Sequence, residues 1–533
     1  MKKVFSMLAA TLMSVCAMSE VNYQTIPLAK QINIDATGKQ ATIVKGTTAV
    51  TYTANNAQMK RNAEFAKEFL GVQPIESKKA MKEALNLTTG LQSENPDAYR
   101  ITVDKKGITI QGASESGVFY GLQTLRKSVM LEKGDTIRLP YATIEDEPRF
   151  LYRGVMLDCA RHYMPTEFVK KFIDIIALHG ANKFHWHLTD DQGWRAEIKA
   201  LPDLAKKGSY RPYTIMGRNV GLWDMENAIY DDTPEEGYYT QEEMQEVVAY
   251  AAERYITVIP EIDLPGHMVA ALSVYPELGC TGGPYFVRPY WGVDPDVLCA
   301  GNPKTLEFIH TVLGEICQIF PSKYIHVGGD ESPRVRWEHC DKCQAKKKEL
   351  GLANEAQLQT YILKDVEKFL ANHNRELIGW DEILEGGLSD NATVMSWRGY
   401  NGGIEAAKQH HKVIMTPTDN CYIDYYQLKD INRQPYGIGG YLPLSKVYSM
   451  EPIPAELSEE EGKYILGAQC NLWTEYVVSP DQAMFMLLPR LAAMSEVQWM
   501  QPETKNYEKF CERLGGMQQM YRKLGYKYCA AYE

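Results

Sequence analysis

The stretch KYIHVGGDESP, Lys323 to Pro333, joins an apolar run to two glycines and two adjacent acids. The apolar run predicts a short buried strand, and the glycines predict a sharp turn at its end. Neighbouring carboxylates repel each other, so placing Asp330 beside Glu331 costs free energy unless their surroundings make use of both. A turn in solvent is the simpler interpretation. A pair of catalytic acids at the end of a buried strand is the alternative.

The same pattern, a short apolar run that ends in polar residues, recurs from Leu151 onward. The eight runs are YRGVMLD, NKFHWHLTDD, YITVIPEIDLPGH, YIHVGGDE, ELIGWDE, TVMSWRG, KVIMTP and ILGAQCNLWTE. Longer amphipathic segments lie between some of them, at 165–180, 240–254, 302–320 and 353–374. Strands that alternate with helices in this way are typical of an α/β fold of the (β/α)8 TIM barrel type, whose active site lies at the carboxyl ends of the strands.

Acids, tryptophans and histidines occupy many of these predicted strand ends. They are His187, Asp190, Asp263, His267, Asp330, Glu331, Trp380, Asp381, Trp397, Trp473 and Glu475. One acid at such a place is often only a helix cap, but so many together indicate a site. Carboxylates can act as acid or base, tryptophans can form flat walls for a sugar ring, and Arg161 can bind neighbouring hydroxyls. This combination favours a glycosidase.

The chain before the barrel has a different pattern. An alternating run at 99–112 predicts a hairpin that turns at Lys105, Lys106 and Gly107, and 114–130 predicts a helix. We therefore expect a small N-terminal α+β domain over 20–147 and a barrel domain with a C-terminal helix over 148–533. The length of 533 residues and the hydrophobic content of 45% fit two globular domains. The net charge of −11, without a basic block, argues against nucleic-acid binding.

The first residues, MKKVFSMLAATLMSVCAMSE, predict a secretory signal peptide over 1–19. The apolar run is too short to span a membrane, and no later stretch is long and apolar enough to do so. Export to the periplasm or beyond the cell is therefore expected. Lipoprotein anchoring at Cys16 is a second interpretation, which the bulky Val15 before the cysteine disfavours.

The 11 cysteines have irregular spacing. Cys340 and Cys343 form a lone C-x-x-C pair, and no second pair follows at the spacing of a zinc site. We therefore expect no metal and no cofactor. Cys280 and Cys299, which bracket a loop rich in glycine and proline, are the best candidates for a disulfide.

Several motifs together resemble the family 20 glycoside hydrolases, the β-N-acetylhexosaminidases. They are ARHYMP, NKFHWHLTDDQGWR, IPEIDLPGH, HVGGDE, GWDE, MSWRG and GAQCNLWTE, in this order. The resemblance covers roughly Arg153 to Trp499, and the preceding segment looks like the N-terminal domain of that family. It implies an exo-acting, retaining enzyme that removes terminal N-acetylglucosamine or N-acetylgalactosamine from β-linked glycans. The attacking group would be the substrate's own 2-acetamido oxygen, through an oxazolinium intermediate.

The resemblance also implies roles for individual residues. Glu331 would be the general acid and then the base, and Asp330 would hold the acetamido N–H and stabilise the oxazolinium. Shared negative charge and partial burial would keep Glu331 protonated near neutral pH. A break in the strand after the glycines would let both acids reach the pocket. The other implied positions are Asp190 and His267 as support for Glu331, Tyr422 for the acetamido oxygen, Trp380, Trp397 and Trp473 as the walls, Arg161 for O3 and O4, Glu475 for O4 and Asp424 for O6.

Two other functions compete with this one. His185 and His187 lie on one face of a strand, as in metal-dependent hydrolases with the same barrel, and His267 and His326 are available as further ligands. A sugar-binding module that has lost catalysis is the other alternative. The sequence leaves the oligomeric state open.

Overall fold

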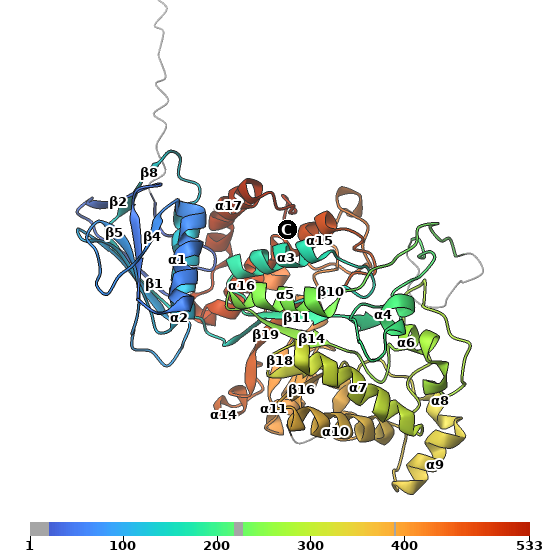
Figure 1. Cartoon of the computed structure of the whole chain (residues 1–533). Coiled ribbons are helices and arrows are strands. Elements are labelled where there is room, and N and C mark those ends of the chain that lie inside the picture. The colour runs from blue at the N-terminus through green and yellow to red at the C-terminus, as the bar shows by residue number, and fades with distance from the viewer. Residues whose placement is uncertain (1–20, 218–227, 389–390) are drawn as a thin grey trace, which may run out of the picture.

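A computed structural model of the chain describes residues 21–217, 228–388 and 391–533 (Figure 1). The predicted signal peptide, with Cys16, lies outside the described residues. Among the described helices, none combines the length and the apolar character needed to cross a membrane.

Eight parallel strands form a closed barrel, as predicted. In order around the barrel they are β10 (Tyr152–Asp158), β11 (Lys183–His187), β14 (Thr257–Glu261), β15 (Tyr324–His326), β16 (Glu376–Trp380), β17 (Thr393–Ser396), β18 (Val413–Met415) and β19 (Ile465–Leu472). The first strand pairs with the last, from Tyr152 opposite Gly467 to Leu157 opposite Leu472. Each of the eight apolar runs supplies one strand, so the (β/α)8 prediction is confirmed.

Helices connect the strands on the outside of the barrel (Figure 1). The main ones are α3 (Thr166–Leu178), α5 (Gln241–Ala252), α7 (Pro303–Ile319), α10 (Ala356–Asn372), α11 (Asn401–Lys408) and α16 (Arg490–Trp499). Their starts follow from the sequence: Thr240 and Glu243 form a capping box on α5, and Asn302 caps α7 before Pro303. The connection between β16 and β17, residues 381–392, is short for a link between two parallel strands. It begins with η3 (Asp381–Leu384), a short 3-10 turn.

Shorter elements decorate the loops and the chain ends. They are β12 (Thr189–Asp190), β13 (Gly193–Trp194), α4 (Asp203–Gly208), α6 (Val269–Val274), η2 (Pro276–Leu278), α8 (Val335–Glu338), α9 (Asp341–Glu349), α12 (Thr418–Cys421), η4 (Ile431–Arg433), α13 (Leu444–Tyr448), α14 (Glu459–Gly462), α15 (Pro480–Leu487), η5 (Pro502–Thr504) and α17 (Tyr507–Leu524). Most of those between β11 and β19 lie in loops that leave the carboxyl ends of the strands.

The N-terminal part contains a seven-stranded sheet and a two-stranded sheet. The larger sheet has the order β1 (Gln31–Ile34), β9 (Ala142–Asp146), β6 (Tyr99–Asp104), β7 (Gly107–Gly112), β5 (Ala84–Thr89), β3 (Ala49–Tyr52) and β4 (Gln73–Glu76), and the smaller pairs β2 (Gln40–Val44) with β8 (Thr136–Pro140). β6 and β7 form the predicted antiparallel hairpin. Helices α1 (Ala57–Leu70) and α2 (Glu115–Val129) pack beside the sheet, in blue in Figure 1.

A buried cluster joins this part to the barrel. Arg153, at the start of β10, binds Asp97 through a 2.9 Å ion pair, and its guanidinium lies over the rings of Tyr120 and Trp499. The Trp499 indole N–H in turn donates to Asp146 at 3.0 Å. These contacts lie at the amino ends of the strands, the end of a TIM barrel that serves stability.

Candidate active site

A pocket opens at the carboxyl ends of the strands and gathers residues from six of the loops. It is lined by Arg161, Asp330, Glu331, Trp380, Trp397, Tyr422, Asp424, Tyr425, Ile438, Trp473 and Glu475. Nine of these eleven are residues for which the sequence predicted a role, and Tyr425 and Ile438 were not predicted. They lie up to some three hundred positions apart in the chain, so only the barrel brings them together.

The acid pair enters the pocket through a backbone that leaves strand geometry. β15 ends at His326, and then Gly328, Gly329 and Glu331 all have positive φ, at 66°, 94° and 43°. In a regular strand, successive side chains point to opposite faces. The left-handed turn removes that alternation, so both acids line one pocket. The expected break in the strand is therefore present.

Gly328 is needed for its size as well as for its φ. A Cβ there would lie 1.7 Å from Asp263 Oδ1. Asp263, a predicted strand-end acid, does not line the pocket but lies buried beneath the turn. Burial and the neighbouring Asp330 raise the pKa of Asp263 well above its ordinary value.

We expect Gly328→Ala to lower the free energy of unfolding by about 2–4 kcal/mol, because the new methyl group combines backbone strain with a clash against Asp263. Gly90→Ala is the matched control: Gly90 has φ +95°, and a Cβ there would meet no atom within 4 Å. Strain alone should cost Gly90→Ala about 1–2 kcal/mol. Denaturant titration of both variants measures the difference, and equal losses would show that the approach of Asp263 is not tight.

A chain of polar side chains runs from β11 to the acid pair. His187 Nε2 lies 2.8 Å from Asp190 Oδ2, and Asp190 Oδ1 lies 3.1 Å from His267 Nδ1. The other ring nitrogen of His267, Nε2, lies 3.5 Å from Glu331 Oε2 and 3.6 Å from Asp330 Oδ2. The predicted supporting pair, Asp190 and His267, therefore lies behind the two acids and contacts them through one imidazole.

This chain determines the protonation of the acids. Burial alone would lower the pKa of His267, but Asp190 outweighs it and raises that pKa well above its ordinary value. Burial would raise the pKa of Glu331, but the hydrogen bond and charge of His267 lower it. Burial raises the pKa of Asp330 to about 6.

The structure therefore differs from the expectation that shared negative charge and partial burial keep Glu331 protonated near neutral pH, because the neighbouring His267 lowers the pKa of Glu331. The resemblance placed His267 in support of Glu331, but the sequence could not show that its imidazole lies directly against Glu331 and lowers the pKa of that carboxyl. His267 and Glu331 are thus positioned to share one proton across their 3.5 Å contact.

Aromatic rings form the wall of the pocket. Trp380 and Trp473 have their ring centroids 5.8 Å apart, and Trp397 stacks on Tyr422 at 6.1 Å with an interplanar angle of 24°. The indole N–H of Trp397 donates to Glu382 at 2.9 Å, which fixes the tilt of the ring. Flat apolar surfaces at several angles suit a pocket that encloses a small ring with an apolar substituent.

The opposite side of the pocket is polar. Arg161 forms a 2.9 Å ion pair with Asp190, and its Nη1 lies 4.0 Å from Glu475 Oε1. Burial, reinforced by Glu475, raises the pKa of Asp424 well above its ordinary value. Burial also raises the pKa of Glu475, although Arg161 opposes this. This side therefore offers a charged guanidinium donor and two carboxyl groups as hydrogen-bonding partners.

Sequence reasoning missed Glu261, a fully buried carboxylate at the end of β14. It binds His185 and His326 at 2.9 Å each, accepts the Trp380 indole N–H at 2.9 Å, and also contacts His187. The signal was an acid inside the apolar run YITVIPEIDLPGH, two positions before Asp263. Because Glu261 is their shared partner, both histidines of the HWH motif contact a carboxylate within the barrel core.

Other predicted residues lie beside the pocket. Asp381 accepts from Arg398 Nε at 2.6 Å and from the backbone amides of Trp397 and Arg398, so it fixes that loop. The expected Cys280–Cys299 disulfide is absent, since all cysteines in the described ranges are free. Cys280 lies against Cys343 instead, because the loops after β14 and β15 meet.

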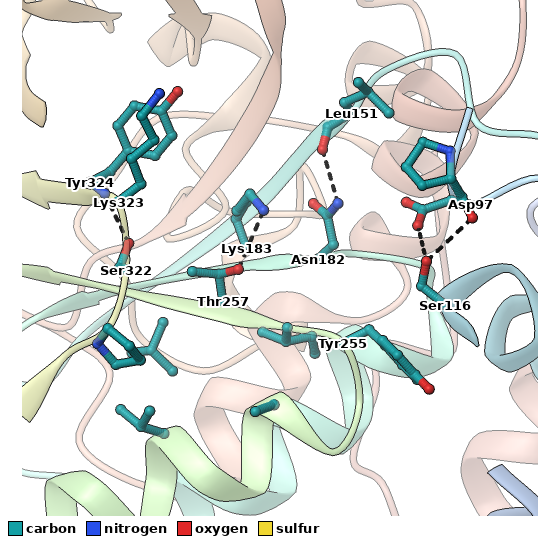
Figure 2. Close-up of a pocket in the computed structure, with 16 residues that line it drawn as sticks. Asp97, Ser116, Leu151, Asn182, Lys183, Tyr255, Thr257, Ser322, Lys323 and Tyr324 are labelled. Atoms are coloured by element: carbon teal, nitrogen blue, oxygen red, sulfur yellow. Dashed lines mark hydrogen bonds between the residues drawn. The ribbon is translucent and has the colours of Figure 1, made fainter. Parts of the chain in front are cut away.

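A larger cavity lies at the other end of the barrel, between the two domains (Figure 2). Lys183, Thr257 and Tyr324, from the amino ends of three strands, line it together with Asp97 and Ser116 of the N-terminal part. Figure 2 shows its polar groups bound to one another, as in the 2.6 Å hydrogen bond from Ser116 to Asp97. It contains no grouping of acid, base and aromatic wall like that of the pocket.

Comparisons with known proteins agree with this geometry. Residues 150–502 match the family described as "Glycosyl hydrolase family 20, catalytic domain", and residues 22–147 match "Glycosyl hydrolase family 20, domain 2". A beta-hexosaminidase of Porphyromonas gingivalis is 45% identical over 425 residues, which are 78% of this chain and 52% of that protein. One of Vibrio furnissii is 39% identical over 75% of this chain and 64% of its own length. This chain thus spans about half to two thirds of these two relatives.

Solved structures are similar over almost the whole chain. The GH20 beta-N-acetylhexosaminidase of Streptomyces coelicolor A3(2) has a TM-score of 0.80 and 28% identity, and the match covers 95% of this chain and 97% of that one. A GH20 exo beta-N-acetylglucosaminidase of Vibrio harveyi, in complex with N-acetylglucosamine, has a TM-score of 0.81 and 30% identity over 96% of this chain and 79% of that one. With the matches to both of its domains, these likenesses show that the chain belongs to glycosyl hydrolase family 20.

Proposed function

We propose that the protein is an exo-acting, retaining β-N-acetylhexosaminidase that works by substrate assistance. The observation that carries this proposal is the adjacent pair Asp330 and Glu331 in a pocket walled by Trp380, Trp397 and Trp473. The relatives from Porphyromonas gingivalis and Vibrio furnissii are named beta-hexosaminidase, which supports the proposal. Its substrates would be glycans that end in a β-linked N-acetylglucosamine or N-acetylgalactosamine.

In the first step, the acetamido oxygen of the substrate attacks its own anomeric carbon. Asp330 accepts a hydrogen bond from the acetamido N–H and stabilises the positive charge of the oxazolinium that forms. Tyr422, whose hydroxyl pKa burial raises well above its ordinary value, stays protonated and orients the acetamido oxygen. The tryptophan wall encloses the acetamido methyl group.

The proton for the leaving group comes from the pair formed by Glu331 and His267. Asp330, with a pKa of about 6, is ionised near neutral pH, and once substrate excludes water from the pocket its negative charge raises the pKa of the adjacent Glu331. The proton then moves from His267 Nε2, 3.5 Å away, to Glu331, which delivers it to the glycosidic oxygen. Glu331 next accepts a proton from the water that opens the oxazolinium. Two inversions at one carbon give net retention.

The polar side of the pocket selects a terminal sugar. Arg161 binds O3 and O4, Glu475 binds O4, and Asp424 binds O6, so a chain that continued through these hydroxyls would displace those contacts. Cleavage therefore removes one residue at a time from the non-reducing end.

Turnover of chromogenic N-acetylglucosaminides and N-acetylgalactosaminides tests the proposal, with proton NMR of the first-formed anomer. We expect the β anomer and almost no hydrolysis of the matching glucoside, which lacks the acetamido group. Binding of N-acetylglucosamine without turnover would favour a sugar-binding module. Hydrolysis that depended on a metal held by His185 and His187 would favour a metal-dependent hydrolase.

Activity should fall on the acid side through the titration of Asp330. Its pKa is raised to about 6, and it must be ionised to stabilise the intermediate, so kcat/KM should decline as pH falls through about 6. The profile is measured with an aryl N-acetylglucosaminide that has a good leaving group, which leaves little demand for the acid. An acid limb near 3.8, the ordinary value, would show that burial does not perturb this group.

We also propose that the protein is exported, to the periplasm or beyond the cell. This rests on the sequence pattern of residues 1–19 alone. Cell fractionation, with N-terminal sequencing of the mature protein, tests it.

A further inference from the structure

Four cysteine side chains from two loops meet at the rim of the barrel, outside the pocket. Cys280 and Cys299 lie in the loop between β14 and α7, and Cys340 and Cys343 lie between β15 and α10, around the start of α9. Their Sγ atoms all lie within 4.8 Å of one another. Cys299 and Cys343 are 3.6 Å apart, and the pairs Cys280–Cys343 and Cys299–Cys340 are 3.8 Å apart. Three are buried, and Cys280 is partly exposed.

These distances between sulfur atoms are too long for disulfide bonds. A disulfide needs its sulfurs about 2.05 Å apart, and each sulfur can have one partner only. Cys343 is about equally close to Cys280 and Cys299, and Cys299 is about equally close to Cys340 and Cys343. Four thiolates around a tetrahedral zinc ion, each about 2.3 Å from the metal, have their sulfurs about 3.8 Å from one another. The observed sulfur–sulfur distances of 3.6–3.8 Å, with Cys299 and Cys343 each close to two other cysteines, match this tetrahedral arrangement.

We propose that Cys280, Cys299, Cys340 and Cys343 bind one structural zinc ion. Four protein ligands leave no open position, so the site is closed and holds structure rather than performing chemistry. Sulfur-only tetrahedral sites select zinc or iron, and zinc is the usual occupant of a lone, non-redox site of four cysteines that joins two loops. The C-x-x-C spacing of Cys340 and Cys343 is that of a zinc knuckle. The second pair comes from a loop some forty residues earlier, which is why the sequence showed no second motif.

The backbone around the cluster is built for this contact. A Cβ on Gly301 would lie 2.1 Å from the carbonyl carbon and oxygen of Lys342, so no side chain fits where the two loops meet. A Cβ there would also lie 2.4 Å from the amide nitrogen of Cys343, so the two loops pack directly against each other beside the cysteines.

Two further contacts hold the same loops together. The Trp337 indole N–H, from α8, donates to the Leu298 carbonyl at 2.9 Å. Arg336 binds Asp296 at 2.7 Å. Protein contacts therefore hold the two loops together near the cysteines, which lowers the entropy lost when an ion binds.

The zinc ion would connect the two loops that supply the acid pair and its histidine. His267 lies in the first loop, and Asp330 and Glu331 lie in the second, nine or more positions before Cys340. The 3.5 Å contact between His267 and Glu331 depends on how these loops sit relative to each other. The cluster is therefore a positioning device for that contact, and it takes no part in the chemistry itself.

Metal analysis of the purified full chain tests the site without reference to activity. We expect about one zinc per chain by plasma mass spectrometry. Titration with a mercurial thiol reagent should release that zinc to a chromogenic chelator, because the reagent displaces metal from thiolates but not from histidines or carboxylates. This separates the cysteine site from the buried group of His185, Glu261 and His326, which also lie close together. After chelation in denaturant, without a reductant, all four cysteines should be alkylated.

Variants provide the matched comparison. Cys280→Ser, at the partly exposed corner, should lower zinc occupancy at least tenfold after dialysis against a chelator, whereas Cys511→Ser, on α17 outside the cluster, should keep it. The wild-type release experiment stands even if a cysteine variant does not fold. Cysteines that resist alkylation until reduced, zinc that the mercurial does not release, one iron in place of zinc, or no metal after reduction and reconstitution with zinc would each overturn the proposal.

Discussion

Glu331→Gln is expected to lower kcat by about 10²–10⁴-fold on N-acetylglucosaminides whose leaving group is another sugar, because the amide cannot protonate the departing oxygen. Aryl glycosides with a strongly acidic phenol as leaving group need little protonation, so their first step should be much less affected. Glutamine keeps the size of the side chain, and ligand binding and the melting temperature should be nearly unchanged. The measurement is a plot of log kcat/KM against leaving-group pKa, which should become steeper in the variant.

Two controls support this assignment. Glu338→Gln makes the same change at an exposed position of the same loop and should leave the plot unaltered. Azide, a nucleophile that needs no general base, should restore turnover of the activated substrates by Glu331→Gln if breakdown of the intermediate has become limiting. Equal losses on good and poor leaving groups would remove Glu331 from the acid role.

Asp330→Asn is expected to slow the first step by about 10²–10³-fold whatever the leaving group, because the lost charge stabilises the oxazolinium and not the aglycone. A thiazoline analogue of that intermediate should bind tightly to the wild type and poorly to the variant. The acid limb of the pH profile near 6 should also disappear from the residual activity. If the variant bound the thiazoline as tightly as the wild type, substrate assistance through Asp330 would be excluded.

The two variants are most informative together. In Glu331→Gln the loss of activity should depend on the leaving group, and thiazoline binding should be unchanged. In Asp330→Asn the loss should be the same for all leaving groups, and thiazoline binding should be weakened. The opposite pattern would mean that the two acids have exchanged roles. Adjacent positions in one left-handed turn make such an exchange a real alternative, which the sequence order alone does not decide.

The barrel was predictable because each of its strands is a separate apolar run with a clear end. TVMSWRG and KVIMTP, for example, end in polar residues at the positions where β17 and β18 end. Most predicted residues of the pocket follow from the same rule, since carboxyl ends of strands meet at one face. Tyr422 and Asp424 were implied only by the family resemblance, and no rule of spacing could place them, Tyr425 or Ile438 within the long connection between β18 and β19.

The errors have one physical origin, which is contact between loops. The Cys280–Cys299 pairing was inferred within a single loop, whereas the structure brings a second loop against it. The protonation of Glu331 was inferred from its neighbours in sequence, whereas His267 arrives from a different crossover. Glu261 was missed because an acid in an apolar strand resembles an ordinary strand-end residue until the three histidines that share it are seen together.

During synthesis on the ribosome, the pocket can be completed only after the barrel closes, because it contains residues that follow both the first and the last strand. Asp158, at the end of the first strand, accepts the backbone amide of Thr474 at 3.0 Å, and Arg161 lies over the ring of Trp473 at 5.0 Å. In each pair, the first residue is synthesised some three hundred residues before the second. The ribosome adds roughly 5–20 residues per second. During that interval the other barrel strands are added one after another, and the pocket stays incomplete. The pocket can therefore be completed only late in synthesis, when β19 pairs with β10.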